Sequence, residues 1–175
     1  MTGTMQARPV PVTGDSFRDA LARHAAGVVV VTSQPASGGP AGLTATSFTS
    51  VSLAPPLVSF YVAVSSSTFP RLRAAPAFAV NVLGHDQAEV AGRFAARDVD
   101  RFAAPTRWRR GPAGEPLLDG AAVRLRCGWH SVQEIGDHLL VVGRVVAVEL
   151  GAAGTAPLLY HRGRFGRFAA HRRRG

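Results

Sequence analysis

Short β-type runs follow one another at close spacing along this chain, with turn-forming prolines and glycines between them. Only two stretches have helical periodicity, and both are brief, so strands and helices do not alternate regularly. A doubly wound parallel sheet needs that alternation, because a helix joins each of its strands to the next. The pattern therefore predicts a mainly β, antiparallel barrel. The runs expected to be strands are 28–34, 41–48, 50–53, 57–64, 78–83, 122–132 and 137–150.

Prolines, glycines and capping residues divide this pattern. Pro55 and Pro56 cannot donate ladder hydrogen bonds and should separate two strands, and Gly143 predicts a bend or bulge inside the last run. Asp15 and Asp86 are the expected N-caps of the two short helices. Residues 96–120 are rich in proline and glycine, which predicts a long surface excursion of the kind that is commonly functional.

The length of 175 residues suits one domain. We expect a flexible N-terminal arm over 1–14, a single domain over 15–168 and a basic tail over 169–175. No apolar run is long enough to cross a bilayer and the N-terminus lacks the apolar centre of a secretory signal, so the expected location is cytoplasmic, with no membrane partner.

The net charge of +9 raises the possibility of nucleic-acid binding, but six arginines from Arg162 onward supply most of it. All 20 basic residues are arginine, which indicates a compositional bias and weakens any argument from arginine to phosphate recognition. We therefore predict no nucleic-acid partner.

Cys127 is the only cysteine, which favours a buried structural thiol. The six histidines have no ligand-like spacing, so no metal is expected.

Dinucleotide-fold, P-loop and nucleophile-elbow signatures are missing. What remains is two clusters of hydroxyl side chains, one in the run from Thr44 to Ser50 and one from Ser65 to Thr68. Neutral hydroxyls and strand-edge amides suit a planar ligand with a polar rim and a phosphate, such as a flavin. Serine and threonine are also common in strands and turns for structural reasons, so composition alone does not decide between a flavin site and a purely structural role.

Four separated blocks, taken together and in order, resemble the short-chain flavin reductase family. They are GLTATSFTSVSLAPPLVSF, SSSTFPRLRAAPAFAVNVL, CGWHSVQEIGDHLLVVGRVVAVEL and PLLYHRGRFGRF. Members of this family are the small components that feed reduced flavin to two-component monooxygenases. The resemblance implies an FMN-binding split β-barrel, antiparallel and Greek-key-like, usually a homodimer. It also implies reduction of FAD or FMN by NADH or NADPH, followed by transient transfer of reduced flavin to a monooxygenase.

The resemblance also implies roles for individual residues. Those expected to bind flavin are Thr44, Ala45, Thr46, Ser47, Ser66, Ser67, Thr68, Arg101 and Gly136. His138 matches the histidine of a GDH motif that faces the nicotinamide side of the flavin, and Asp137 is expected to fix it; these two are the expected catalytic residues. The same three residues, 136–138, could instead form only a hairpin turn.

Two positions depart from the family pattern, and two alternatives to the reductase stay open. Thr46 stands where the family often has asparagine, and Ala54 stands where an acidic residue commonly precedes the prolines. The alternatives are a split-barrel flavoprotein that keeps FMN and oxidises its own substrate, and a non-enzymatic binding module. The arginines between 101 and 110 could meet an adenosine diphosphate group, which slightly favours FAD, and NADH is the preferred reductant.

Overall fold

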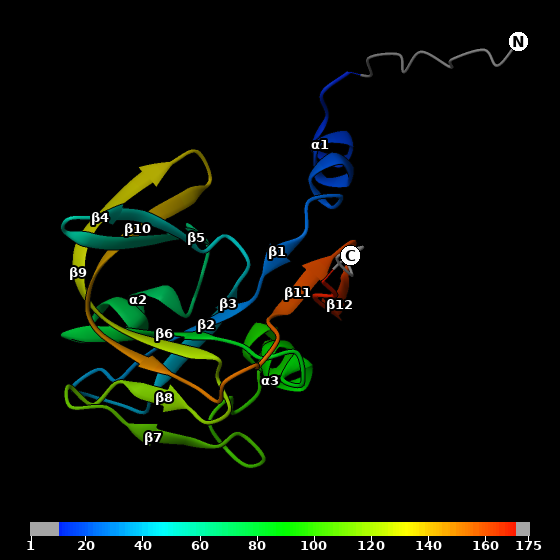
Figure 1. The fold of residues 1–175 in the computed structure, drawn as a ribbon. Helices are drawn as coiled ribbons and strands as arrows, with labels where there is room; N and C mark the ends of the chain where they lie inside the picture. The colour runs from blue at the N-terminus through cyan, green and yellow to red at the C-terminus, as the bar shows by residue number, and fades with distance from the viewer. Residues whose placement is uncertain (1–10, 171–175) are drawn as a thin grey trace, which may run out of the picture.

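The computed structural model describes residues 11–170, in which antiparallel β-structure dominates (Figure 1). Seven strands form one sheet in the order β3-β2-β6-β9-β10-β5-β4, and all neighbouring pairs run antiparallel. The prediction of an antiparallel β fold is thus confirmed. The strands of this sheet are β2 (Val29–Ser33), β3 (Ala41–Ala45), β4 (Thr49–Leu53), β5 (Pro56–Ala63), β6 (Ala77–Val82), β9 (Val123–Ile135) and β10 (His138–Leu150).

The seven-stranded sheet curls until its two ends meet. Strand β3 contacts β5, although four strands lie between them in the sheet. The Ser47 hydroxyl accepts a hydrogen bond from the Tyr61 backbone N–H at 2.9 Å, which ties the chain after β3 to β5. The curl encloses a space rather than presenting two open faces, as a barrel does.

Two smaller sheets flank the curled one. Strands β1 (Ala26–Gly27), β11 (Leu158–His161) and β12 (Arg164–Arg167) form one, and β7 (Trp108–Arg110) pairs with β8 (Pro116–Leu118) in the other. The prediction of a long surface excursion over 96–120 is wrong in part, because this region contains the β7–β8 hairpin and β8 is buried. Its prolines and glycines turn the chain around a hairpin, in which the Gly111 N–H donates to the carbonyl of Glu115.

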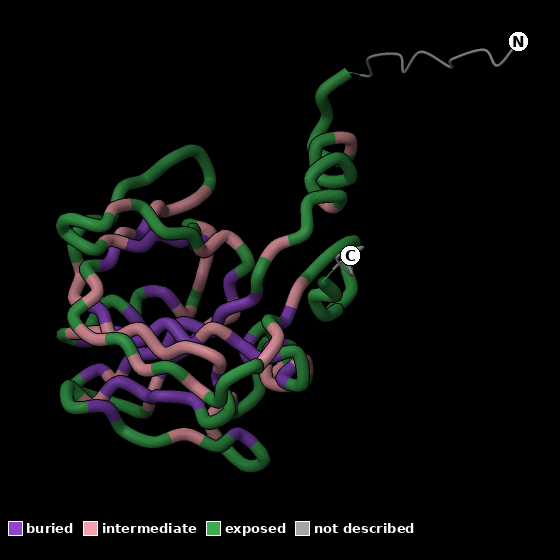
Figure 2. The backbone as a smooth tube through the Cα atoms, viewed as in Figure 1, coloured by how far each residue is buried: buried purple, intermediate pink, exposed green. Residues whose placement is uncertain are grey.

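Strand β2 is buried on both faces, which explains its unbroken valine run (Figure 2). Val29 and Val31 point into the core inside the curl, with Phe60 and Phe78. Val28 and Val30 belong to a second core outside it, which includes Phe94 and Leu158. Alternate residues of a strand face opposite sides, so this short segment lines both cores.

The helices of residues 11–170 are α1 (Gly14–Leu21), α2 (Phe69–Arg73) and α3 (Ala88–Ala95). The N-cap of α1 is Thr13, not Asp15, because Thr13 and Ser16 form a reciprocal capping box. Gln87 rather than Asp86 precedes α3, and its side chain bonds the Gly84 N–H and the Asp119 carbonyl. Helix α1 stands away from the curled sheet and has no buried residue (Figures 1 and 2).

Gly143 lies at a register shift between β9 and β10, as the sequence predicts. A Cβ atom there would lie 2.4 Å from Cζ of Phe78, so the core ring occupies the space that any side chain would need. The bulge and the missing side chain together let β10 bend over the core.

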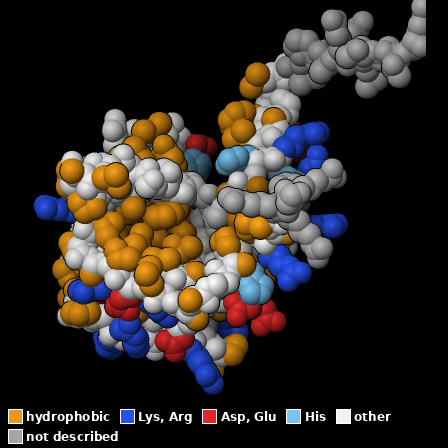
Figure 3. Space-filling model, in the orientation of Figure 1, with side chains coloured by type: hydrophobic (Ala, Val, Ile, Leu, Met, Phe, Trp, Pro, Cys, Tyr) orange, Lys and Arg blue, Asp and Glu red, His pale blue; other side chains and the backbone are white. Residues whose placement is uncertain are grey.

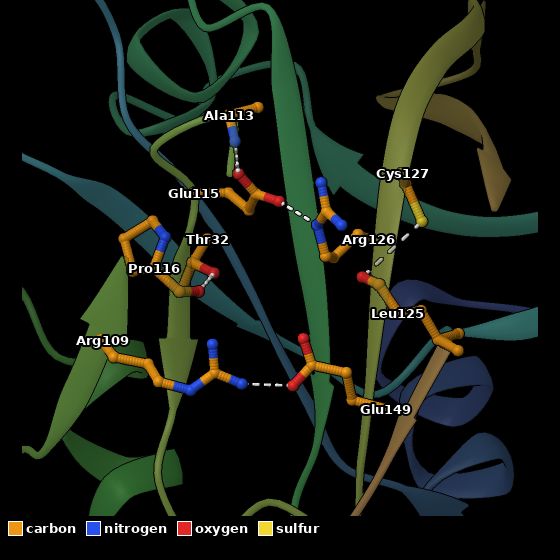
Figure 4. A network of polar contacts seen from close by, with 9 residues as sticks. All are labelled: Thr32, Arg109, Ala113, Glu115, Pro116, Leu125, Arg126, Cys127 and Glu149. Carbon is orange, nitrogen blue, oxygen red and sulfur yellow. Dashed lines mark hydrogen bonds and ion pairs between the residues drawn. The ribbon is translucent and has the colours of Figure 1, made fainter. Parts of the chain in front are cut away.

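A buried carboxylate links the β7–β8 hairpin to the sheet (Figure 4). Glu115 is 1% exposed and accepts hydrogen bonds from the Ala113 N–H at 2.9 Å and from Nε of Arg126 at 2.5 Å. Arg109 pairs with Glu149 nearer to solvent.

No helix within residues 11–170 combines the length and the apolar character needed to span a membrane. The expected arm and tail lie outside the described residues over 1–10 and 171–175.

Candidate functional site

A cavity of ≈ 840 Å³ opens where β3, β5, the segment between β5 and α2, and the end of α3 meet. Its walls combine hydroxyl, aromatic and guanidinium side chains. The lining residues are Leu43, Thr44, Tyr61, Val62, Ala63, Ser65, Ser66, Ser67, Thr68, Arg71, Phe94, Ala95, Arg97, Asp98, Val99 and Arg101. The volume lies within the range of small-molecule sites.

Five of the predicted flavin-binding residues line this cavity: Thr44, Ser66, Ser67, Thr68 and Arg101. They come from three parts of the chain, which the curl of the sheet brings together. Ser66 accepts a hydrogen bond from the Phe69 N–H at 3.3 Å, and Thr68 accepts one from Nη1 of Arg101 at 3.0 Å. The second hydroxyl cluster therefore faces a fixed cation.

Arg101 is the most constrained charge of the site. Its Nη1 also donates to the Gly42 carbonyl at 3.1 Å, and its Nη2 donates to the Ala96 carbonyl at 2.6 Å. Burial lowers the pKa of the Arg101 guanidinium below its usual value, and the nearby charge of Arg71 lowers it further. Two like charges held at one cavity favour an anionic ligand there.

Residues of the first hydroxyl cluster have different roles: one lines the cavity and others stabilise the fold. Thr44 lines the cavity, and its hydroxyl donates to the Ala91 carbonyl at 2.7 Å. Ala45 is buried in the core, Thr46 is exposed away from the lining, and Ser47 is the tie to Tyr61. The structure thus brings Thr44 alone of these four residues to the cavity wall.

Gly136 and Asp137 form the turn between β9 and β10, and His138 begins β10; the three residues lie beside the cavity rather than in its lining. Gly136 has φ 62°, a conformation that favours glycine. His138 pairs with Ala63, a lining residue, and the Asp137 carbonyl accepts from the Val64 N–H at 3.0 Å. Nδ1 of His138 lies 2.6 Å from Oδ1 of Asp137, and this hydrogen bond, with the attraction between the two groups, lowers the pKa of the Asp137 carboxyl.

Sequence reasoning missed several lining residues, among them Tyr61, Arg71 and Phe94. Phe94 appears in the sequence only as an apolar position of the second helix, and Tyr61 only as part of a strand. Arg71 carried a signal that was available, an arginine three residues beyond the hydroxyl cluster. Among residues 11–170, no group of three or more histidine, cysteine, aspartate or glutamate side chains is arranged to hold a metal ion.

Comparisons with known proteins agree with this geometry. Residues 21–169 match the model of the flavin reductase like domain. An NADH:FMN oxidoreductase of Rhodococcus qingshengii is 44% identical over 157 residues, which cover 88% of this chain and 81% of the relative. The reductase component of the flavin-dependent trigonelline monooxygenase of Acinetobacter baylyi is 38% identical over 85% of this chain and 47% of its own length.

A solved structure extends the comparison to the fold. The NADH:FAD oxidoreductase of Streptomyces globisporus C-1027, in complex with NAD and FAD fragments, superposes with a TM-score of 0.85 and 38% identity. The match covers 93% of this chain and 98% of that one. The split-barrel fold that the sequence predicts is confirmed by this agreement, and the chain belongs to the flavin reductase like domain family.

Proposed function

We propose that this protein is an NADH-dependent flavin reductase, which reduces FAD or FMN and supplies the reduced flavin to a partner monooxygenase. The observation that carries the proposal is the cavity in which neutral hydroxyls, aromatic side chains and three arginines meet, in a chain of this family. Two of the relatives named above are an NADH:FMN and an NADH:FAD oxidoreductase, and the third is the reductase component of a flavin-dependent monooxygenase.

Hydride transfer from the nicotinamide to the flavin is chemistry that the two nucleotides carry themselves. The protein has to hold them in contact and exclude unproductive poses. We assign the flavin phosphate to Ser66, Ser67, Thr68 and Arg101, because hydroxyls and a guanidinium suit a phosphate. Thr44 then lies along the flavin. The backbone segments that surround the flavin contain the other four expected residues, Ala45, Thr46, Ser47 and Gly136.

His138 is assigned to the nicotinamide side of the flavin. It sits next to Ala63 at the cavity wall, and Asp137 is within hydrogen-bond distance of its ring. In this arrangement Asp137 is a positioning residue that fixes the imidazole, and His138 orients the nicotinamide or meets negative charge that develops on the reduced ring. Neither residue has to transfer a proton.

We also propose that the protein is a homodimer. On the inner face of the curled sheet, Val148 lies opposite Leu125, which packs against the core, yet Val148 is 57% exposed. Leu150, two residues on, is 78% exposed. Hydrophobic side chains also gather in a hollow below β4 and β5 on the face that Figure 3 presents. A second copy of the chain would cover such a surface.

The cytoplasmic location and the absence of a nucleic-acid partner stay predictions of the sequence.

The decisive test is the loss of NADH absorbance in mixtures of the purified protein with excess FAD or FMN, in parallel with NADPH. We expect oxidation that depends on added flavin and is faster with NADH. Oxidation without added flavin, by a protein that stays yellow through dialysis, would instead indicate a flavoprotein that retains FMN. No oxidation of either nicotinamide with either flavin would leave only a binding role.

A further inference from the structure

A second cavity of ≈ 460 Å³ adjoins the first, and three residues, Arg71, Val99 and Arg101, belong to both linings. The second cavity lies between the loop after β2, which carries Gly39, and the segment after α3. Its remaining lining residues are Gly39, Pro40, Ala41, Gly42, Asp100, Phe102, Ala103 and Trp108. A ligand that extends beyond the flavin phosphate would pass the two arginines and enter this space.

Both arginines are fastened at the junction of the two cavities. Nη2 of Arg71 donates to the carbonyls of Gly39 at 3.1 Å and Pro40 at 3.3 Å, both in the second lining. Nη1 of Arg101 bonds to Gly42 of the second lining and to Thr68 of the first. These contacts hold two positive charges between the cavities.

The two guanidiniums retain capacity for an anion. Within residues 11–170 neither of them forms an ion pair, and Nε of Arg101 is buried without a hydrogen-bond partner. Asp100, in the same lining, directs its carboxylate to the N–H groups of Phe102 and Ala103 instead. A pyrophosphate offers several oxygens along its length and can engage two guanidiniums at once.

Beyond the arginines the wall is aromatic. Phe94 of the first cavity stacks edge-on against Phe102 of the second, with ring centroids 5.1 Å apart, and Phe102 does the same with Trp108 at 5.5 Å. The Trp108 indole N–H donates to the Phe102 carbonyl, which fixes the indole ring. Rigid aromatic side chains beside glycine suit a planar base.

We propose that the second cavity binds the adenosine group of a dinucleotide, that its pyrophosphate lies between Arg71 and Arg101, and that FAD rather than FMN is therefore the flavin this chain prefers. The inference rests on the proposed function and names its substrate. NADH also contains adenosine diphosphate. FAD is favoured as the source because the second cavity continues directly from the hydroxyl cluster assigned to the flavin phosphate.

Equilibrium dialysis without nicotinamide tests the preference directly, with riboflavin, FMN and FAD as probes. We expect FAD to bind about tenfold more tightly than FMN, since it adds a second phosphate and a base to the contacts of the mononucleotide. Equal affinities, or a preference for FMN, would overturn the proposal.

A side chain placed in the second cavity provides the matched variant. Gly39 has no atom within 4 Å of the position of a Cβ, so Gly39→Phe has room to enter the space. We expect it to lower the ratio of FAD affinity to FMN affinity about tenfold, the advantage that the second cavity supplies. Ala103→Phe, from the other loop, should lower the same ratio. Ser37→Phe, on the same loop as Gly39 but outside the lining, should leave it unchanged.

The kinetic measurement separates the two sources of adenosine. If Gly39→Phe raises the KM for NADH while the FAD to FMN ratio holds, the second cavity serves the nicotinamide dinucleotide and the proposal is wrong. A failure of the proposed function looks different, because no flavin of the three would then support NADH oxidation, whatever its affinity.

Discussion

Hydroxyl side chains in β3 and in the turn after it serve two purposes in this protein, and residue type alone does not show which purpose each one serves. Thr44 reaches the cavity wall, whereas Ser47 holds the curled sheet together through the backbone of Tyr61. The residues are three positions apart, and the turn that ends β3 decides their directions. Sequence could therefore predict that hydroxyls gather here but not that the fold itself uses several of them.

Glu115 is the residue whose loss should destabilise the fold most clearly. Glu115→Ala leaves Arg126 and the Ala113 N–H without their buried partner, and we expect the free energy of unfolding to fall by about 3 kcal/mol. Glu149→Ala is the control in the same region (Figure 4), since its pair with Arg109 is partly exposed and should contribute less than about 1 kcal/mol. Urea unfolding of both variants measures the difference, and equal losses would refute the assignment.

Cys127 should behave as an unreactive thiol. It is fully buried, and burial raises the pKa of its thiol to about 12 from a usual value of 9.0. The neutral thiol is thus favoured in the folded state, and this stability is present below pH 9 and lost as the pH rises towards 12. We expect no labelling by a thiol reagent at pH 8 until the protein unfolds, and a shallower loss of stability above pH 9 in Cys127→Ala. Rapid labelling of the folded protein would contradict this.

His138 should affect the reaction more than the binding of flavin. It adjoins the cavity at Ala63 without belonging to its lining, so His138→Ala is expected to slow flavin reduction about tenfold or more while flavin affinity changes little. Stopped-flow reduction measures the first quantity and equilibrium dialysis the second. His130→Ala, an exposed histidine on the same hairpin, is the control. An unchanged reduction rate with a collapsed flavin affinity would show that the role is wrong.

At the scale of elements, the strands are the best predicted part of the fold. All seven strands of the main sheet fall on predicted runs, because β-branched runs bounded by proline and glycine specify them locally. The hairpin of β7 and β8 was missed. Each of its strands has only three residues, too few to show a period, and contacts with the sheet stabilise them instead.

Gly143 tests whether the β10 bulge depends on a missing side chain. Gly143→Ala places a methyl group 2.4 Å from the Phe78 ring, and we expect a loss of about 1–3 kcal/mol in the free energy of unfolding. In Gly166→Ala, on β12, the methyl group meets no atom within 4 Å, and the change should stay within about 0.5 kcal/mol. Thermal unfolding compares them. A Gly143→Ala variant as stable as the parent would mean that Phe78 can move aside.

At the scale of the molecule, the proposed dimer uses the uncovered inner face of β9 and β10 as its interface. Val148→Glu puts a charge on that face, and we expect it to convert a dimer into a monomer of half the mass in light scattering after gel filtration. Val148→Thr keeps the shape without the charge and should remain dimeric at high concentration. A parent protein that is monomeric at all concentrations would rule out the proposed dimer.

The site is also a property of the whole molecule, which limits what sequence could predict of it. Thr68 and Arg101 stand far apart in the chain. The local hydroxyl cluster indicated Thr68, whereas only the family resemblance suggested Arg101. The second cavity has no local signature, because it arises only where the loop after β2 and the segment after α3 come together. The position of Arg71 after the hydroxyl cluster does not show that it lies beside Arg101. The sequence shows both arginines, but it does not show that their side chains meet at one cavity.

The double burial of β2 has a consequence for how the protein melts. Val30 and Val31 are consecutive residues, yet they line different cores, so any motion that withdraws one from its core also withdraws the other. Because both cores share β2, the loss of this strand from one core also disrupts the other core. The main sheet and the layer outside it should therefore unfold in one cooperative transition, with no stable half-folded form in which one of the two cores survives alone.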